Sequence, residues 1–420
     1  MANGEKSVSV IHNRVFQVIM MSGIMLQIGI WVRNFAILLY VTDKTDGNAF
    51  AVSLIYLAEF LPIFVFSFIG GTFADRWRPK LTIVSCDFLS ACSVFAVLLA
   101  LVYGSWKAVF FATLISAILS QFSQPSVMKL FKLHLPDEQT QTAMSLFQTM
   151  FAGFMVLGPI LGTFVYQQFG IHVAIGTMGV AFLLSAAIMT MLPHEDKSAK
   201  QVAGTSFLRE MSSGIRYVFS SKILSLLGVG FVIAGLALGL IQPLPIFLVT
   251  ERLKLPETDL QWLIGASGFA MILGGVASMS AAKRVAPHIL LMVGMTVNAV
   301  SIAVSGWSSA LWLTLVAQFC SGFVFPGIQV GINTLMLKNS AAEYIGRVNG
   351  ILNPLFMGSL VVTMSISGLL KNQFSLVSMY EISGALFLLG VVLLLPMHRL
   401  IRQSEKTQAT AMVNSEMPSN

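Results

Sequence analysis

The sequence predicts an all-α membrane protein with twelve transmembrane helices in two six-helix halves. Of its 420 residues, 56% are hydrophobic and only 10% are charged, whereas soluble domains average about 45–50% apolar and about 25% charged residues. Twelve apolar runs are long enough to cross a bilayer. A polar stretch divides them six and six, so the composition excludes an ordinary soluble protein.

Each run has about twenty predominantly apolar residues, which is the length needed to span the hydrocarbon core. We expect an N-terminal six-helix bundle at 1–193, a cytoplasmic linker at 194–222, a C-terminal six-helix bundle at 223–398 and a disordered cytoplasmic tail at 399–420. The predicted spans are 14–41, 50–73, 80–103, 107–130, 141–166, 171–193, 223–250, 260–281, 287–306, 310–336, 348–370 and 376–397.

The distribution of basic residues predicts the orientation in the membrane. With the N-terminus inside, 19 of the 25 lysine and arginine residues fall on the inner side, five on the outer side, and Arg33 lies within a span. Positive residues favour cytoplasmic loops, so both termini are expected on the cytoplasmic side. We expect the membrane to be the plasma membrane, here a bacterial inner membrane. This bias accounts for the net charge of +7 without a nucleic-acid partner.

No pattern in the sequence predicts an enzyme or a metal site. Cys86, Cys92 and Cys320 all lie within spans without paired spacing, and the six histidines lie near span ends. No nucleophile–base set emerges, so we expect neither catalysis nor a bound cofactor.

The linker contains one amphipathic segment. Phe207-Leu208-Arg209-Glu210-Met211 is followed by Gly214-Ile215-Arg216-Tyr217-Val218-Phe219, with apolar residues three and four apart. This spacing predicts a helix along the inner membrane surface. The helix serves either as a tether between the halves or as a regulatory docking site.

Two charges lie well inside the membrane, where an ionisable side chain is costly and by default marks a functional site. Arg33 lies nine residues before Thr42, at the outer end of the first span, and Glu59 nine residues after Phe50, at the outer start of the second. At 1.5 Å per residue, both lie about 13 Å below the outer boundary. Asp87 lies nearer the inner end of its span, and we expect it to brace the adjoining loop.

Three interpretations of Arg33 and Glu59 remain open. Glu59 can be a proton-binding carboxylate whose proton affinity depends on the distance to Arg33, because a neighbouring cation stabilises the ionised form. The two residues can instead be a static ion pair. In the third interpretation, Arg33 recognises an anionic substrate.

Polar side chains within the spans are candidates for lining a substrate cavity. Gln242-Pro243-Leu244-Pro245 and Asn353-Pro354 also predict helix breaks that free backbone carbonyls. With many phenylalanines and methionines nearby, we expect a cavity for a large amphipathic molecule. The candidates are Gln27, Trp31, Gln148, Gln242, Asn298, Gln329, Asn333 and Asn353.

A charged decapeptide connects the second and third predicted spans. Gly71-Thr72-Phe73-Ala74-Asp75-Arg76-Trp77-Arg78-Pro79-Lys80 is too polar for hydrocarbon and predicts a short inner loop. A weaker copy, from Gly275 to Arg284, occurs 204 residues later, as expected for parallel repeats. The pattern of Gly71, Asp75 and Arg76 with closing basic residues resembles the loop signature of the major facilitator superfamily, although Arg78-Pro79-Lys80 departs from its usual ending.

A second motif, Gly158-Pro159-Ile160-Leu161-Gly162, resembles the antiporter motif of exporting members of that superfamily. Thr163 and Phe154 stand where the motif has glycines. Pro159 predicts a bend, and Gly158 and Gly162 allow close packing of a neighbouring helix.

Further segments resemble bacterial macrolide-efflux proteins and related siderophore exporters. They are Leu61-Pro62, Ala74-Asp75-Arg76, Phe207–Met211 and Gly346-Arg347-Val348. The resemblance implies the major facilitator fold and a gating role for the loop residues Gly71, Asp75, Arg76, Arg78 and Lys80. In the family, the motif's aspartate lies against the inner end of the eleventh helix, which here follows Arg347.

The resemblance implies a monomeric, proton-driven exporter of amphipathic small molecules that works by alternating access. Its partners would be the substrate, protons and membrane lipids, such as anionic inner-leaflet lipids beside the basic loop. The proton gradient would be the energy source. A lipid or glycolipid flippase, a proton-coupled importer and a non-transporting membrane sensor are the alternatives.

Overall fold

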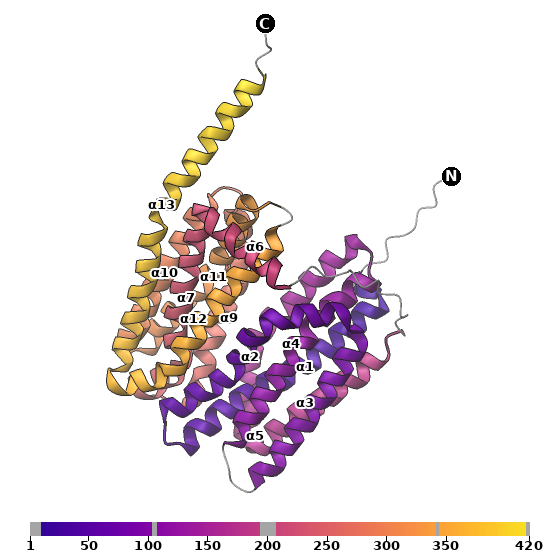
Figure 1. Cartoon of the computed structure of the whole chain (residues 1–420). Coiled ribbons are helices and arrows are strands. Elements are labelled where there is room, and N and C mark those ends of the chain that lie inside the picture. Colours follow the sequence, from indigo (N-terminus) through magenta and orange to yellow (C-terminus); the bar gives the residue numbers. More distant parts are fainter. Residues whose placement is uncertain (1–9, 103–106, 194–206, 342–343, 417–420) are drawn as a thin grey trace. The chain divides into compact units, whose positions relative to one another are not determined.

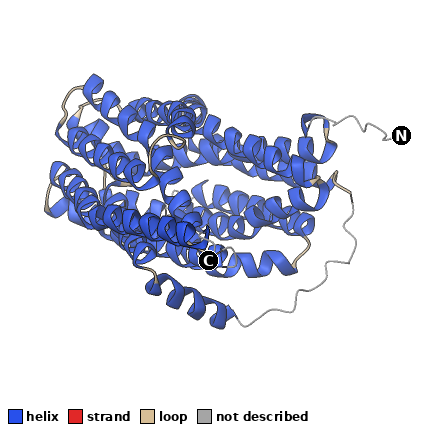
Figure 2. Ribbon diagram, turned by 90° about the horizontal axis from the view of Figure 1, so that it is seen from above, coloured by secondary structure: helices blue, strands red, loops and turns tan. Residues whose placement is uncertain are grey.

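The computed structural model describes residues 10–102, 107–193, 207–341 and 344–416. Within the described helices, the structure gives the backbone but not the side chains of 67–76, 102, 137–138, 207–210, 398 and 401–416. Within the described ranges the regular structure is entirely helical (Figure 2).

The helices follow the predicted spans closely (Figure 1). Helices begin at Pro79 and Pro287, where the missing proline N–H needs no partner, and the Asn13 side chain caps α1 by accepting from the Val15 amide at 2.9 Å. The helices are α1 (Arg14–Lys44), α2 (Ala49–Arg76), α3 (Pro79–Val102), α4 (Ala108–His134), α5 (Asp137–Thr190), α6 (Phe207–Ser220), α7 (Lys222–Ile241), α8 (Pro245–Phe247), α9 (Leu260–Ala281), α10 (Pro287–Trp307), α11 (Leu311–Asn339), α12 (Ile345–Gln373) and α13 (Leu376–Glu416), with short 3₁₀ or π turns at Val10–His12, Leu248–Arg252 and Glu257–Asp259.

Within the described residues, eleven helices are long and apolar enough to cross a membrane. The longest, α5, has 54 residues and leaves helical geometry at Gly170, whose φ is 73° and ψ is −177°. A residue without a Cβ adopts this positive φ readily. The chain reverses there, so α5 contains the fifth and sixth predicted spans and the total is the expected twelve.

The chain forms two compact units. The first comprises residues 1–203 and 245–268, and the second comprises 204–244 and 269–420. In the first unit α1 packs against α5, and α3 against α4 and α5. In the second, α10 packs against α11 and α13, and α7 against α12 and α13. The linker helix α6 belongs with the second unit, where it packs on α12.

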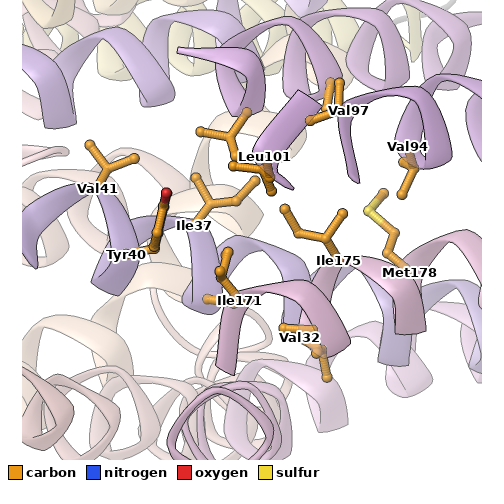
Figure 3. Close-up of a cluster of buried hydrophobic side chains, with 14 of the residues drawn as sticks. Val32, Ile37, Tyr40, Val41, Val94, Val97, Leu101, Ile171, Ile175 and Met178 are labelled. Atoms are coloured by element: carbon orange, nitrogen blue, oxygen red, sulfur yellow. The ribbon is translucent and has the colours of Figure 1, made fainter. Parts of the chain in front are cut away.

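Two separate apolar clusters hold the first unit together. One contains Val32, Ile37, Val94, Leu101 and Ile175, contributed by α1, α3 and α5 (Figure 3). It includes the ends of these helices that the charge bias places outside. The other cluster is centred on Ile19, Ile83, Leu130, Phe131 and Met189, nearer the opposite ends of the same helices and of α4. The stretches of helix between the two clusters carry most of the unit's buried polar side chains.

Three local expectations need correction. Helix α2 continues through Arg76, so the predicted loop 71–80 shrinks to Trp77 and Arg78. The predicted break at Asn353-Pro354 is absent, because α12 runs through it; the predicted break after Gln242 is present, since α7 ends at Ile241.

The remaining correction concerns the C-terminus. The tail expected to be disordered continues α13 through Glu416; after Pro396 it contains helix-forming residues and no glycine. In α5 the dihedrals stay helical at Pro159, and the bend expected there stays a prediction.

Candidate functional site

The two intramembrane charges of the first unit are joined by an amide. Arg33 of α1 donates from Nε and Nη2 to Oδ1 of Asn34, at 3.0 and 2.6 Å. Asn34 donates from Nδ2 to Oε1 of Glu59 in α2, at 3.1 Å. Nη1 of Arg33 also donates to Oγ of Ser116 in α4, at 2.6 Å. These four residues, which connect three helices, are called the Glu59 cluster below.

Hydrogen-bond chemistry fixes the orientation of the Asn34 amide. A guanidinium only donates, so the Asn34 carbonyl must face Arg33. The amide nitrogen therefore faces Glu59, whose carboxylate accepts. Among the described contacts, Arg33 and Glu59 make no direct ion pair. The sequence placed the two residues at the same depth, but their interaction passes through Asn34.

The Glu59 cluster borders an internal cavity of about 150 Å³. Arg33 is 4% exposed, and both it and Glu59 line the cavity. The second carboxylate oxygen of Glu59, Oε2, has no hydrogen-bond partner within the described residues. A proton can therefore bind Oε2 without displacing Asn34.

Asp87 of α3 lines the same cavity. It is 2% exposed, and its Oδ2 accepts a 2.6 Å hydrogen bond from the Ser185 hydroxyl of α5. Ser185 in turn is 2.7 Å from the Ser22 hydroxyl of α1. The expectation that Asp87 braces the inner loop is therefore wrong, because its side chain faces the interior of the bundle.

The glycines of the Gly158-Pro159-x-x-Gly162 segment lie against α1. A Cβ added at Gly162 would lie 2.6 Å from Cβ of Phe35 and 2.8 Å from the Trp31 carbonyl oxygen. A Cβ at Gly158 would overlap the Trp31 indole. Trp31, expected to line a cavity, is thus packed against these glycines. The close helix approach predicted from the glycines is present, and the neighbour is α1.

The second unit has its own cavity, of about 190 Å³. Four of the predicted cavity residues line it: Asn298, Gln329, Asn333 and Asn353. Asn298 accepts a 2.5 Å hydrogen bond from Ser321. The other three amides make no side-chain hydrogen bond among the described residues. The rest of the described lining is uncharged and mainly apolar, with Phe231, Phe325, Phe356, Phe387, Met295, Met336 and Met357 among it.

The remaining cavity candidates lie elsewhere. Gln27 is buried and lines a cavity of about 40 Å³ in the first unit. Gln148 is exposed in an open groove beside Lys132. Gln242 caps the C-terminal end of α7. These three residues do not join the cavity of the second unit.

The proposed gating residues are only partly described. Gly71 and the side chains of Asp75 and Arg76 lie in the segment whose side chains are not described, and Arg78 is exposed. Lys80 donates from Nζ to the Thr190 carbonyl at 2.8 Å and also to the Leu192 carbonyl. It therefore ties the start of α3 to the end of α5.

Arg347 belongs to an aromatic stack at the start of α12. Its guanidinium carbon lies 4.8 Å from the centre of the Tyr344 ring. Tyr344 stacks on Tyr217 of α6 with ring centres 4.2 Å apart, and the Tyr217 hydroxyl accepts from the Ala341 amide at 2.9 Å. This stack holds the linker helix against α12.

Comparison with known proteins identifies the family. A model described as Major Facilitator Superfamily matches residues 19–255 and 227–413. The chain belongs to the major facilitator superfamily. It is therefore a transporter and not an enzyme, as the resemblance implied.

Among curated members of the superfamily, an uncharacterized MFS-type transporter of Bacillus subtilis, YkuC, is 28% identical over 396 residues, covering 91% of this chain and 90% of that protein. The multidrug efflux pump Tap of Mycolicibacterium fortuitum is 26% identical, with 83% and 87% covered. Macrolide efflux protein A of Streptococcus pyogenes is 21% identical, with 89% and 93% covered.

Solved structures confirm the major facilitator fold. A crystal structure of a variant of the nucleoside transporter NupG superposes with a TM-score of 0.76 at 12% identity, covering 92% of this chain and 100% of that one. A POT family transporter bound to a peptide conjugate superposes with a TM-score of 0.74 at 11% identity, covering 92% and 96%. At these identities the similarity concerns the fold alone.

Three residues of this site were not found from the sequence: Asn34, Ser116 and the interior-facing Asp87. The position of Asn34, directly after a buried arginine, was the available signal, since buried charges need hydrogen-bond partners. Ser116 gave no such signal, because one serine among several in a span says nothing of its neighbour on another helix.

Proposed function

We propose that this transporter is a proton-coupled exporter of amphipathic small molecules. The observation that carries the proposal is the Glu59 cluster. It places a carboxylate in the membrane interior, beside a cavity, and connects it to a buried cation through a neutral amide. A carboxylate in this position can gain and lose a proton while Arg33 keeps its bonds to Asn34 and Ser116.

The cluster links protonation to helix position. Ionised Glu59 attracts both the Asn34 amide and the positive charge behind it, so α1 and α2 are held together. Protonation removes that charge and weakens the charge-assisted hydrogen bond to about half its strength. The two helices can then separate, and alternating access follows from this difference between the two protonation states.

The substrate is proposed to bind in the cavity of the second unit. Its uncharged lining of aromatic and methionine side chains suits an apolar body. Gln329, Asn333 and Asn353 supply donors and acceptors for a few polar groups of the ligand. An amphipathic molecule without a strong charge fits both features.

Two relatives support export as the direction of transport. Tap is named a multidrug efflux pump, and the Streptococcus pyogenes relative a macrolide efflux protein. The Gly158–Gly162 packing against α1 adds a structural feature expected of antiporters.

The test is substrate-dependent proton movement in proteoliposomes that contain the purified full-length chain. Erythromycin and ethidium serve as probes, with a pH-sensitive dye inside the vesicles. The wild type is compared with Glu59→Gln and with Glu381→Gln, which alters an exposed carboxylate near the start of α13. We expect probe-dependent proton flux in the wild type and in Glu381→Gln, and none in Glu59→Gln.

Flux that persists in Glu59→Gln would overturn the role of Glu59. Proton movement in the same direction as the probe would replace export with proton-coupled import. Transbilayer movement of a labelled lipid without proton flux would favour the flippase.

The remaining proposals concern cellular placement and partners. We place the monomer in a bacterial inner membrane with both termini in the cytoplasm, next to lipids and without a nucleic-acid partner. A fluorescent protein fused to the C-terminus should fluoresce only if that end is cytoplasmic.

A further inference from the structure

The cavity beside Glu59 contains a second carboxylate that the proposed coupling does not use. We propose that Asp87 is a second proton-binding site of this bundle, and that protons move between Glu59 and Asp87 along the hydroxyl groups of α4. This inference rests on the proposed role of Glu59 as a proton site.

The cavity lining connects the two carboxylates. Its polar side chains from α4 are Ser116, Ser120, Ser123 and Gln124. The three serines are four and three residues apart, so they lie along one face of the helix. A cavity of about 150 Å³ also has room for several water molecules.

Helix geometry shows that this row of hydroxyls covers the difference in depth. Counted from the helix ends that the charge bias places outside, Ser116 lies eight residues into α4 and Glu59 ten residues into α2. These are depths of about 12 and 15 Å. Ser123 and Asp87 each lie fifteen residues from those ends of α4 and α3, at about 22 Å. The serines therefore begin near Glu59 and end at the depth of Asp87.

The hydrogen bonds of Asp87 leave one oxygen available for a proton. Ser185 donates to Oδ2, while Oδ1 has no partner among the described residues. Glu59 is bound in the same way, with one oxygen held by Asn34 and the other without a partner in the described part of the chain. In each carboxylate a neutral donor fixes the side chain and the second oxygen can carry the proton.

The surroundings of Asp87 contain few other titratable groups. In the described lining, α1 contributes Arg33, α2 contributes Glu59, and α3 contributes Cys86 and Asp87 itself. The residues from α4 and α5 are hydroxyl, amide or apolar. Arg33 is the one cation in this described lining, and it donates to Asn34 and Ser116 rather than to Asp87. No described cation is therefore bound to Asp87 to keep it permanently ionised, and Glu59 is its proton-exchange partner.

The transfer conserves protons and charge. Protonated Glu59 releases its proton into the water of the cavity, along which the α4 hydroxyls are aligned. Ser116 and Ser120 donate to carbonyls of their own helix, so each hydroxyl must turn toward the water before it accepts one proton and donates another. Ionised Asp87 receives the final proton. Glu59 ends ionised, Asp87 ends neutral, and no hydroxyl changes its charge.

The two apolar clusters confine this exchange to the middle of the bundle. On α3, Ile83 belongs to the inner cluster and Ala91 to the outer one, with Asp87 between them. On α4, Ala112 and Val127 bound the serine row in the same way. Beyond Asp87, Ser185 accepts from the Ser22 hydroxyl because its own proton is donated to Asp87, and Ser22 lines the cavity of about 40 Å³.

The test is infrared spectroscopy of the purified full-length protein during a pH titration. A protonated carboxyl group has its own C=O stretching band, so no transported substrate is needed. The variants are Asp87→Asn, Glu59→Gln, the conservative Asp87→Glu, Ser185→Ala, and Glu381→Gln as the surface control. Size-exclusion chromatography checks that each variant is folded.

We expect two buried components in the wild type, one lost in Asp87→Asn and the other in Glu59→Gln. Asp87→Glu should restore the lost component, and Ser185→Ala should shift its frequency because the donor to Oδ2 is gone. After a pH jump, the Glu59 component should form more slowly in Asp87→Asn than in the wild type. If Asp87→Asn does not fold, the frequency shift in Ser185→Ala is the deciding measurement.

The possible failures differ from one another. If Glu59→Gln removes a component but Asp87→Asn removes none and leaves the rate unchanged, the inference about Asp87 is wrong and the proposed function stands. If Glu59→Gln removes no component, the proton role of Glu59 fails and the relay fails with it. An unshifted band in Ser185→Ala would also overturn the assignment of Asp87.

Discussion

Substitutions of Asn34 test two things separately: how much the Glu59 cluster stabilises the protein, and whether it couples proton binding to transport. Asn34→Leu removes two hydrogen bonds accepted from the buried Arg33 guanidinium, at 3.0 and 2.6 Å, and the one donated to Glu59 at 3.1 Å. A hydrogen bond to a charged group contributes about 1.5–3 kcal/mol, so the two bonds to Arg33 alone give an expected loss of about 3–6 kcal/mol in the free energy of unfolding. The hydrogen bond that Arg33 donates to Ser116 remains, which keeps the loss below that of an unsatisfied charge.

The assay is thermal unfolding of the purified protein in detergent. Unfolding entropy is about 2.1 cal/mol/K per residue. For the 420-residue chain this gives about 0.9 kcal/mol/K, so the expected fall in midpoint is about 3–7 °C.

Two further variants serve as controls. Asn298→Leu also removes an amide from within a span, but its partner is the neutral Ser321 hydroxyl, so it should cost only about 0.5–1.5 kcal/mol. Asn34→Asp retains both acceptor bonds to Arg33 but places a second carboxylate against Glu59, and two adjacent carboxylates do not both ionise readily. One of the two then holds a proton, so this variant should shift the pH dependence of proton flux. If Asn34→Leu is no more destabilising than Asn298→Leu, the cluster does not hold Arg33 as described.

Four other substitutions test packing and the second cavity. Gly162→Ala should lower stability by about 1–3 kcal/mol, because the new Cβ meets the α1 backbone, whereas Gly153→Ala, which has open space around it, should raise stability in the same melting assay. Thr163→Val should leave stability unchanged or raise it by up to about 1–3 kcal/mol, since the buried Thr163 hydroxyl has no hydrogen-bond partner; a clear loss would show that the hydroxyl is bonded. Asn353→Leu should weaken erythromycin binding, measured by fluorescence competition with ethidium, by about 2- to 13-fold if that amide makes one hydrogen bond to the ligand; unchanged affinity would place the ligand elsewhere.

The fold was largely predictable from the sequence, because every membrane span must satisfy its backbone internally and be apolar over a fixed length. The sequence also predicted that the chain reverses direction near Gly170, between the fifth and sixth predicted spans. It misjudged the segment from Gly71 to Arg76, which is polar yet helical. Polarity identifies where a span leaves the hydrocarbon, but a helix can continue into the aqueous layer.

The sequence predicted how deep in the membrane the residues of the candidate site lie, but not which neighbours their side chains face. Residue counting along α1 and α2 placed Arg33 and Glu59 at one level. It could not show that Asn34 lies between them, because this depends on side-chain rotamers and helix rotation. The same limit applies to Asp87 and Trp31, which both lie in correctly predicted spans but face neighbours that hydropathy cannot identify.

The stack of Tyr217, Tyr344 and Arg347 has a consequence for dividing the chain into co-expressed fragments. Because α6 packs on α12 through this stack, a cut before Phe207 leaves the linker helix on the fragment that contains its partner. A cut at Ser221, between α6 and α7, would give α6 to the wrong fragment and separate Tyr217 from Tyr344 along the chain. The boundary suited to fragment complementation therefore lies ahead of the linker helix, and the helix itself acts as the first element of the second half.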